Sequence, residues 1–252
     1  MNKRLLVVSD IHGHYEPFMK LMDSVDYRPH EDMLIALGDL IDRGPQSSDV
    51  VKWFLPGHPG DKAIVIKGNH EEGFLHFLEE KMAYSAYVNV FMGGLRTIES
   101  YESVSDEEMQ QHLHFLKNLP YYHRQDGFIF AHAGINTHKA MEYQEPNDLI
   151  YSDMKFFAQG QNTKHPNEIV VFGHTPTGII REKLKESDIG PYIWYDRKYK
   201  NKIGIDCGNQ GHKRLACLDL THCIEYYQPI SKGERVESRT TKEALKIKEV
   251  FR

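Results

Sequence analysis

Short apolar runs recur along the chain and predict buried strands. Each consists of four or five consecutive apolar residues, rich in Val and Ile, and leads into a polar cluster that contains glycine. Unbroken runs of this kind are typical of strands that are covered on both faces. Five such runs occupy residues 5–8, 33–37, 63–66, 128–131 and 169–172. A sixth run, at residues 203–205, gives a weaker signal.

Helical spacing of apolar residues fills the gaps between the early strands. Residues 15–25 and 47–55 show it, and the interval of about 30 residues between strands suits parallel strand–helix–strand units. The same spacing returns after the third run, and the segment that begins at Ser105 starts with a capping-box pattern. We therefore expect a helical insertion at about residues 72–120.

The chain contains no linker rich in Gly, Pro or Ser and no internal repeat, which favours one domain. We place this domain at residues 1–230. Residues 231–252 hold 7 Lys or Arg and 4 Asp or Glu, and we expect a charged tail or a surface helix there.

Composition narrows the class of protein. The 252 residues include 31 Lys or Arg and 36 Asp or Glu, and the net charge of −5 argues against a dedicated nucleic-acid binder. No apolar run approaches the roughly 20 residues that span a bilayer. The first residues have too short an apolar stretch for a signal peptide, and the 3 cysteines form no CxxC pair. We expect a cytoplasmic protein without membrane or nucleic-acid partners, and the oligomeric state stays open.

Polar residues follow the predicted strands in a repeated order. In open α/β sheets the carboxyl ends of strands collect ligands, so these side chains should meet at one edge. Carboxylate, imidazole and amide oxygen suit Mn, Fe or Zn, and the number of such groups fits two ions better than one. Asp39 is placed to be shared by both ions. The collected side chains are Asp10, His12, Asp39, Asp42, Arg43, Asn69, His70, His132 and His174.

The segments SDIHG, GDLIDRG, GNHE, HAG and GHT resemble the signature of the calcineurin-like metallophosphoesterases. More narrowly they resemble phosphoprotein phosphatases of the PPP type, in their bacterial and phage branch. The resemblance runs from residue 5 to about residue 220. It implies an α/β (α+β) fold with a central β-sandwich of mixed sheets flanked by helices. The strand spacing alone suggests a single doubly wound sheet instead.

The resemblance also implies roles for single residues. Two divalent ions, Mn²⁺ before Fe or Zn, would turn a bridging water into the attacking hydroxide, without a phosphoenzyme. His70, held by Asp42, would protonate the leaving oxygen, and Arg43 and Asn69 would contact the phosphate. The first ion would be held by Asp10, His12 and Asp39, and the second by Asp39, Asn69, His132 and His174.

One part of the family pattern is missing. Family members usually supply a second phosphate-binding Arg, but no Arg occurs between Arg124 and Arg181 in this chain. Lys155 stands near the expected place and could supply a point charge instead of a bidentate fork. The missing Arg also raises the alternative of a metal-binding regulatory protein that has lost catalysis.

The substrate has two main alternatives. Dephosphorylation of Ser or Thr in phosphoproteins is the first. The second is hydrolysis of dinucleoside polyphosphates such as diadenosine tetraphosphate. Residues 38–47 and 205–208 resemble segments of the enzymes that carry out this reaction. Symmetrically cleaving enzymes of that kind tend to have a small residue in place of Asp42, so Asp42 argues against that type and leaves asymmetric cleavage open. A phosphoprotein or a phosphorylated small molecule is therefore the expected partner.

Overall fold

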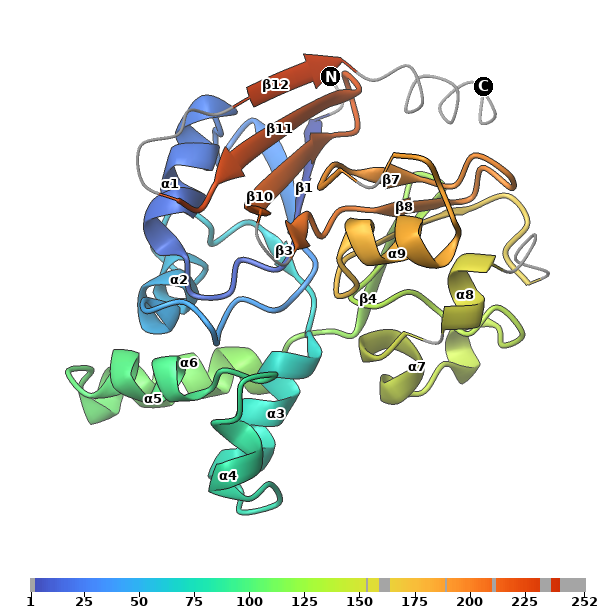
Figure 1. Ribbon diagram of the computed structural model, residues 1–252. Coiled ribbons are helices and arrows are strands. Elements are labelled where there is room, and N and C mark those ends of the chain that lie inside the picture. Colours follow the sequence, from blue (N-terminus) through green and yellow to red (C-terminus); the bar gives the residue numbers. More distant parts are fainter. Residues whose placement is uncertain are drawn as a thin grey trace.

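The computed structural model describes residues 3–152, 154–158, 164–188, 190–209, 212–231 and 237–240 (Figure 1). Two mixed β-sheets stand at the centre, and helices cover their outer faces. All six apolar runs become strands. Within the described residues, no helix combines the length and the apolar character needed to cross a membrane.

The first sheet has the order β12-β11-β10-β1-β2-β3, with β9 (Gly208–Asn209) paired to β10 alone. The strands β1 (Arg4–Val8), β2 (Asp32–Ala36) and β3 (Ile64–Val65) run parallel. The strand β10 (His212–Asp219) pairs antiparallel with β1, and β11 (Ile224–Pro229) and β12 (Glu237–Thr240) continue antiparallel from it. The end of the chain's described part thus completes the sheet that the first strand begins.

The second sheet has the order β4-β5-β6-β8-β7. Its central strands β5 (Phe128–Ala131), β6 (Ile169–Phe172) and β8 (Lys202–Gly204) are parallel. The edge strands β4 (Tyr122–Gln125) and β7 (Trp194–Tyr195) are antiparallel to their neighbours. Both sheets are therefore mixed.

Alternation along the strands explains the sandwich. In β1, Val7 packs into the core between the sheets, whereas Leu6 and Val8 pack into the core under the helices of the first sheet. In β6, Val171 faces the same central core and Val170 faces the opposite side. Because both faces of each strand are covered, the runs are apolar throughout. The sandwich confirms the fold implied by the family resemblance, and the single doubly wound sheet suggested by spacing is wrong.

Helices cover the two outer faces. The first sheet carries α1 (Tyr15–Ser24) and α2 (Ser47–Trp53). The second carries α7 (Pro146–Ile150), α8 (Met154–Ala158) and α9 (Thr177–Lys183), with the short 3₁₀ helix η1 (Met141–Tyr143) before α7. Figure 1 shows these two groups on opposite sides of the molecule.

The helical insertion predicted at about residues 72–120 is confirmed. It lies between β3 and β4 and consists of α3 (Asn69–Leu78), α4 (Tyr84–Tyr87), α5 (Leu95–Tyr101) and α6 (Asp106–Lys117). Ser105 caps α6, and its Oγ accepts a hydrogen bond from the backbone N–H of Glu108. The insertion begins three residues earlier than expected, so Asn69 and His70 sit in the first turn of α3.

The prediction for residues 231–252 mostly lies outside the described residues. Of this segment the structure describes Ser231 and Glu237–Thr240. The latter form the edge strand β12, where we expected a tail or a surface helix. Pairing with β11 explains the difference, because a strand edge can order a polar segment that has no apolar periodicity of its own.

Candidate dinuclear metal site

The predicted site residues gather where the parallel strands of the two sheets end. The first sheet supplies the residues after β1, β2 and β3, and the second sheet those after β5 and β6. Asp10 and His12 follow β1, Asp39 follows β2, Asn69 and His70 open α3 after β3, His132 follows β5 and His174 follows β6.

The backbone at these strand ends is unusually strained. The φ values of Asp10, His12 and Asp39 are 53°, 48° and 54°. These values lie in the left-handed region of the backbone, which residues other than glycine rarely adopt. Asp42, Arg43 and His174 lie in the same region. Such residues each cost of the order of 1–3 kcal/mol and collect at functional sites, where they aim side chains inward.

Glycine lets two of the loops meet. Gly38 has a φ of 87°, and a Cβ there would lie 2.5 Å from the backbone N of Gly68. Only a residue without a side chain therefore allows the loop after β2 to touch the loop after β3. Glu71, which is fully buried, ties the same loops together by accepting hydrogen bonds from the backbone N–H groups of Asp39 and Gly68 at 2.9 and 2.8 Å.

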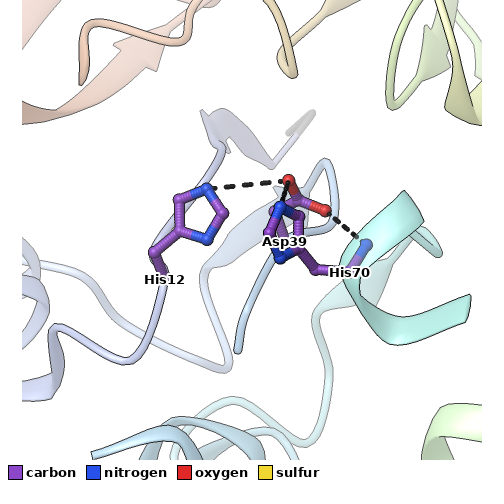
Figure 2. A group of neighbouring side chains, drawn as sticks. All are labelled: His12, Asp39 and His70. Atoms are coloured by element: carbon purple, nitrogen blue, oxygen red, sulfur yellow. Dashed lines mark hydrogen bonds and ion pairs between the residues drawn. The ribbon is translucent and has the colours of Figure 1, made fainter. Parts of the chain in front are cut away.

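His12, Asp39 and His70 form the first group of potential ligand atoms (Figure 2). Their ligand atoms lie within 4.8 Å of one another. The Oδ2 atom of Asp39 is 3.6 Å from Nε2 of His12 and 3.7 Å from Nε2 of His70. Asp10 lies beside this group, with Oδ1 3.9 Å from Nε2 of His12.

Asp39, His132 and His174 form a second group. The Oδ1 atom of Asp39 is 3.3 Å from Nε2 of His132, which in turn is 3.1 Å from Nδ1 of His174. Asn69 joins them, since its Oδ1 is 2.8 Å from Nδ1 of His174 and 3.0 Å from Nε2 of His132. Asp39 takes part in both groups through its two oxygens, which is the geometry that a shared ligand needs.

The electrostatics of the site fit divalent cations. Burial, with the like charge of Asp10, raises the pKa of Asp39 well above its ordinary value although His70 opposes this. Burial and then Asp10 also raise the pKa of Asp206. Burial and the neighbouring His132 lower the pKa of His174 to about 2, and burial lowers that of His12. Neutral imidazoles and crowded carboxylates are the donor set that metal binding requires.

His70 makes a second, separate contact. Its Nδ1 lies 2.7 Å from Oδ2 of the fully buried Asp42. The other oxygen of Asp42 accepts hydrogen bonds from the hydroxyls of Tyr87 and Thr97, both at 2.6 Å. Burial by itself lowers the pKa of His70, but the charge of Asp39 and the hydrogen bond to Asp42 outweigh it and raise the pKa. The hydrogen bond to Asp42 therefore orients the ring of His70, whose Nε2 is the atom that belongs to the first group.

Arg43 lies against the first group. Its Nη1 is 2.7 Å from Nε2 of His12, and its Nη2 is 3.1 Å from Nε2 of His70. Nη2 also donates to the carbonyl oxygen of Phe91 at 3.3 Å. A planar guanidinium at this place can hold two oxygens of a phosphate. Lys155 lies apart from it on α8, where it lines a cavity with Ala133 and Tyr151.

Four residues of the site were missed by sequence reasoning. Glu71 stands within the GNHE segment, and Asp206 follows the sixth apolar run, so the strand-then-ligand pattern could have identified both. Tyr87 and Thr97 belong to the insertion, and no local pattern marks them. They reach Asp42 only through the tertiary fold.

The mixed two-sheet sandwich with helices on its outer faces is the architecture of a metallophosphoesterase. The chain belongs to the calcineurin-like phosphoesterase family, whose profile matches residues 3–207. This family uses a dinuclear metal centre, and the two ligand groups joined at Asp39 suit such a centre.

The sequence is similar to enzymes that cleave dinucleoside tetraphosphates. The chain is 30% identical over 134 residues to a symmetrical bis(5'-nucleosyl)-tetraphosphatase of Chromobacterium violaceum, a match that covers 52% of this chain and 43% of that protein. It thus spans less than half the length of this relative. It is 26% identical over 197 residues to the asymmetrical bis(5'-nucleosyl)-tetraphosphatase PrpE of Halalkalibacterium halodurans, covering 68% of this chain and 77% of that protein.

A solved structure shares the whole fold. The crystal structure of a candidate diadenosine tetraphosphatase superposes on this chain with a TM-score of 0.64 at 21% sequence identity. The match covers 92% of this chain and 95% of the other chain. At this identity the likeness supports the fold alone.

Proposed function

We propose that this chain is a dinuclear-metal hydrolase of dinucleoside polyphosphates. The observation that carries the proposal is the similarity of its sequence to bis(5'-nucleosyl)-tetraphosphatases of both cleavage types. The comparisons favour this alternative over the serine/threonine phosphoprotein phosphatase that we first expected. We place the catalytic domain at residues 1–230, which contain the family match.

The ligand assignment follows the two groups of side chains. Asp10, His12 and Asp39 would hold one ion, and Asn69, His132 and His174 would complete the other with Asp39. Two bound divalent ions would supply an activated water and would neutralise phosphate charge. We keep Mn²⁺ as the first expectation because the donor set is mixed oxygen and nitrogen, with Fe and Zn as alternatives.

The chain's own residues then bind and orient the substrate. Arg43 would hold two non-bridging oxygens of the reacting phosphate, and the amide of Asn69 would add a contact. His70 would donate the proton on Nε2 to the leaving oxygen, because Asp42 fixes its ring, and the charge of Asp39 together with the hydrogen bond to Asp42 raises its pKa. Lys155 would attract the remaining phosphates as a point charge.

The test compares two substrates on one Mn²⁺-loaded preparation. We expect kcat/KM for diadenosine tetraphosphate to exceed that for a phosphoserine peptide by more than a hundredfold. The products also define the cleavage type, because symmetric hydrolysis yields two ADP, whereas asymmetric hydrolysis yields AMP and ATP. A preference for the peptide would reject the proposal.

A phosphomonoester phosphatase is the second candidate function, and the hydrogen bond between Asp42 and His70 favours it. An alkoxide leaves less readily than a nucleotide phosphate, so a buried acid is of most use for phosphoserine or phosphothreonine. A binding protein without catalysis is the third candidate. It would be supported if neither substrate nor p-nitrophenyl phosphate were hydrolysed with Mn²⁺, Fe²⁺ or Zn²⁺.

A further inference from the structure

A polar cavity of about 380 Å³ lies beside the second ligand group. We call it the Tyr151 pocket. It lies between the loop that follows β5 and the helices α7 and α8. Its lining includes Ala133, Ile135, Asn136, Tyr151, Lys155 and Phe156.

Three contacts join this pocket to the candidate metal site. Ala133, in its wall, directly follows His132. The ring of Tyr151 meets the ring of His174 edge to face, with centroids 6.3 Å apart and planes at 87°. Ser152, also in the lining, shares a hydrogen bond of 2.8 Å with Thr175, the residue after His174. A molecule in the pocket would therefore lie next to a phosphate held by the metal site.

The size and the lining of the pocket fit a nucleoside. Its volume lies in the range of small-molecule sites, about 300–1,000 Å³, and is much larger than a phosphate needs. Ala133, Ile135 and Phe156 are buried and give an apolar floor. Tyr151 is 49% exposed, so an aromatic ring is available for stacking in a wall that also holds an amide and an ammonium group.

A larger cavity, of about 1120 Å³, is less suited to the substrate. It lies between β3 and α6 and is lined mainly by apolar side chains such as Leu55, Phe115 and Leu119. Its lining contains none of the candidate ligands or their chain neighbours. Volume alone would favour it, but contact with the site favours the Tyr151 pocket.

We propose that the Tyr151 pocket binds a nucleoside of the substrate, with the base stacked on Tyr151 and the phosphates directed past Lys155 toward His132 and His174. This inference rests on the proposed function and adds to it the place of one nucleoside. Tyr151 would thus select nucleotides over phosphopeptides, since its ring offers a flat base a surface that a peptide side chain cannot fill equally well.

The test measures binding of two probes, ADP and inorganic phosphate, to the Mn²⁺-loaded protein by calorimetry. The wild type should bind ADP more tightly than phosphate. Tyr151→Ala should weaken ADP binding about 10- to 100-fold, the effect of one lost base stack, and should change the phosphate Kd by less than about threefold. Tyr151→Phe keeps the ring and should bind both probes like the wild type.

Tyr143→Ala is the matched control. Tyr143 is 71% exposed on η1 and does not line the pocket, so its removal should leave both dissociation constants unchanged. Equal ADP binding by wild type and Tyr151→Ala would overturn the inference, as would a parallel loss of ADP and phosphate binding. Failure to hydrolyse diadenosine tetraphosphate, with ADP binding as expected, would reject the proposed function and leave the nucleoside site standing.

Discussion

The imidazoles of His12 and His132 are each oriented by the ring nitrogen that points away from the ligand groups. The Nδ1 of His132 lies 2.7 Å from the carbonyl oxygen of Leu37, and that of His12 lies 3.0 Å from the carbonyl oxygen of Ile41. A carbonyl can only accept, so each Nδ1 carries the proton and each Nε2 keeps its lone pair toward the site. His70 differs, because a carboxylate instead of a carbonyl oxygen faces its Nδ1.

This difference leads to the first prediction. For a substrate with a poor leaving group, His70→Asn should lower kcat about 10²–10⁴-fold, because the proton donor is lost. The bound metal, measured by elemental analysis, should stay near two ions per chain. His132→Asn serves as the comparison and should lose metal together with activity. Since the Nε2 of His70 also lies within the first ligand group, a loss of metal in His70→Asn would show that it is a ligand and not the acid.

The second prediction concerns the two hydroxyls that hold Asp42. Tyr87→Phe combined with Thr97→Val leaves one buried oxygen of Asp42 without these donors, so its hold on His70 should weaken. Hydrogen bonds to charged groups contribute about 1.5–3 kcal/mol, which corresponds to about a 10- to 100-fold loss of kcat. The KM should change by less than about threefold, and the loss should be smaller for p-nitrophenyl phosphate, whose leaving group needs little protonation.

Tyr101→Phe controls for the removal of a buried phenol. Tyr101 lies in the same insertion, and its hydroxyl pairs with Nδ1 of His112 at 2.9 Å, away from Asp42. This variant should keep full kcat both for a substrate with a poor leaving group and for p-nitrophenyl phosphate. If it loses as much activity as the double variant, or if the loss does not depend on the leaving group, the two hydroxyls only support the fold.

The residues that could be predicted from sequence are those whose role follows from their place after a strand. Asp10, Asp39, His132 and His174 were expected at one edge because the direction of parallel strands sets where their ends lie, and the structure brings them together. Tyr87 and Asp42 are 45 residues apart and meet only because the insertion folds back. Side-chain pairs of that kind carry no local signal.

At the scale of elements, the insertion contacts Arg43 at two places, the carbonyl oxygen of Phe91 and Gly93. Gly93, between α4 and α5, has a φ of 72°, and its carbonyl oxygen accepts a hydrogen bond from the backbone N–H of Arg43 at 3.1 Å. A Cβ at Gly93 would lie 2.9 Å from Cγ of Arg43. The insertion therefore sets the position of Arg43 by direct packing.

The third prediction uses this contact. Gly93→Ala should displace Arg43 and lower kcat/KM at least about tenfold, in addition to a stability cost of about 1–2 kcal/mol for a left-handed alanine. Gly57→Ala is the control, because Gly57 has a φ of 84° and nothing lies within 4 Å of its added Cβ. Chemical denaturation should show the cost of a left-handed alanine in both variants and a further loss in Gly93→Ala from the contact with Arg43, while only Gly93→Ala should lose activity. Equal activities would mean that Arg43 does not depend on the insertion.

Elements were predictable where a continuous apolar run marks a strand that is covered on both faces. The strand β10 was not predicted, although it completes the first sheet beside β1. Its residues Leu215 and Cys217 face one core and Ala216 and Leu218 the other, yet no polar cluster of the repeated kind follows it. Its pairing joins residues about 210 positions apart, and strand spacing along the chain cannot reveal such a partner.

At the scale of the whole molecule, the candidate ligands come from both sheets. Asp10, His12, Asp39 and Asn69 belong to the first sheet, and His132 and His174 to the second. Direct links already cross between them, because the backbone N–H of His174 donates to Asp10 and Nδ1 of His132 lies against the carbonyl oxygen of Leu37. Ions at this site would therefore crosslink the two halves of the sandwich.

The fourth prediction follows from this crosslink. Ions that bind the folded chain and not the unfolded chain stabilise it by about 2.7 kcal/mol at a hundred times their Kd. For a domain of this size that corresponds to a rise in Tm of roughly 5–10 °C. Scanning calorimetry after chelation, and again after titration with Mn²⁺, should show the rise and its dependence on metal concentration.

His174→Ala separates the crosslink from general ion binding. The variant removes one imidazole of the second sheet together with its contacts to Asn69 and His132, so the Tm of the metal-free variant serves as its own baseline. Added Mn²⁺ should then raise its Tm by only a few degrees, through the ion that the first sheet alone can hold. If the variant gains the full rise, the second ion does not join the sheets. If the wild type gains none, the strained strand ends and buried carboxylates of this site are stabilised by the protein alone, and the dinuclear assignment fails with them.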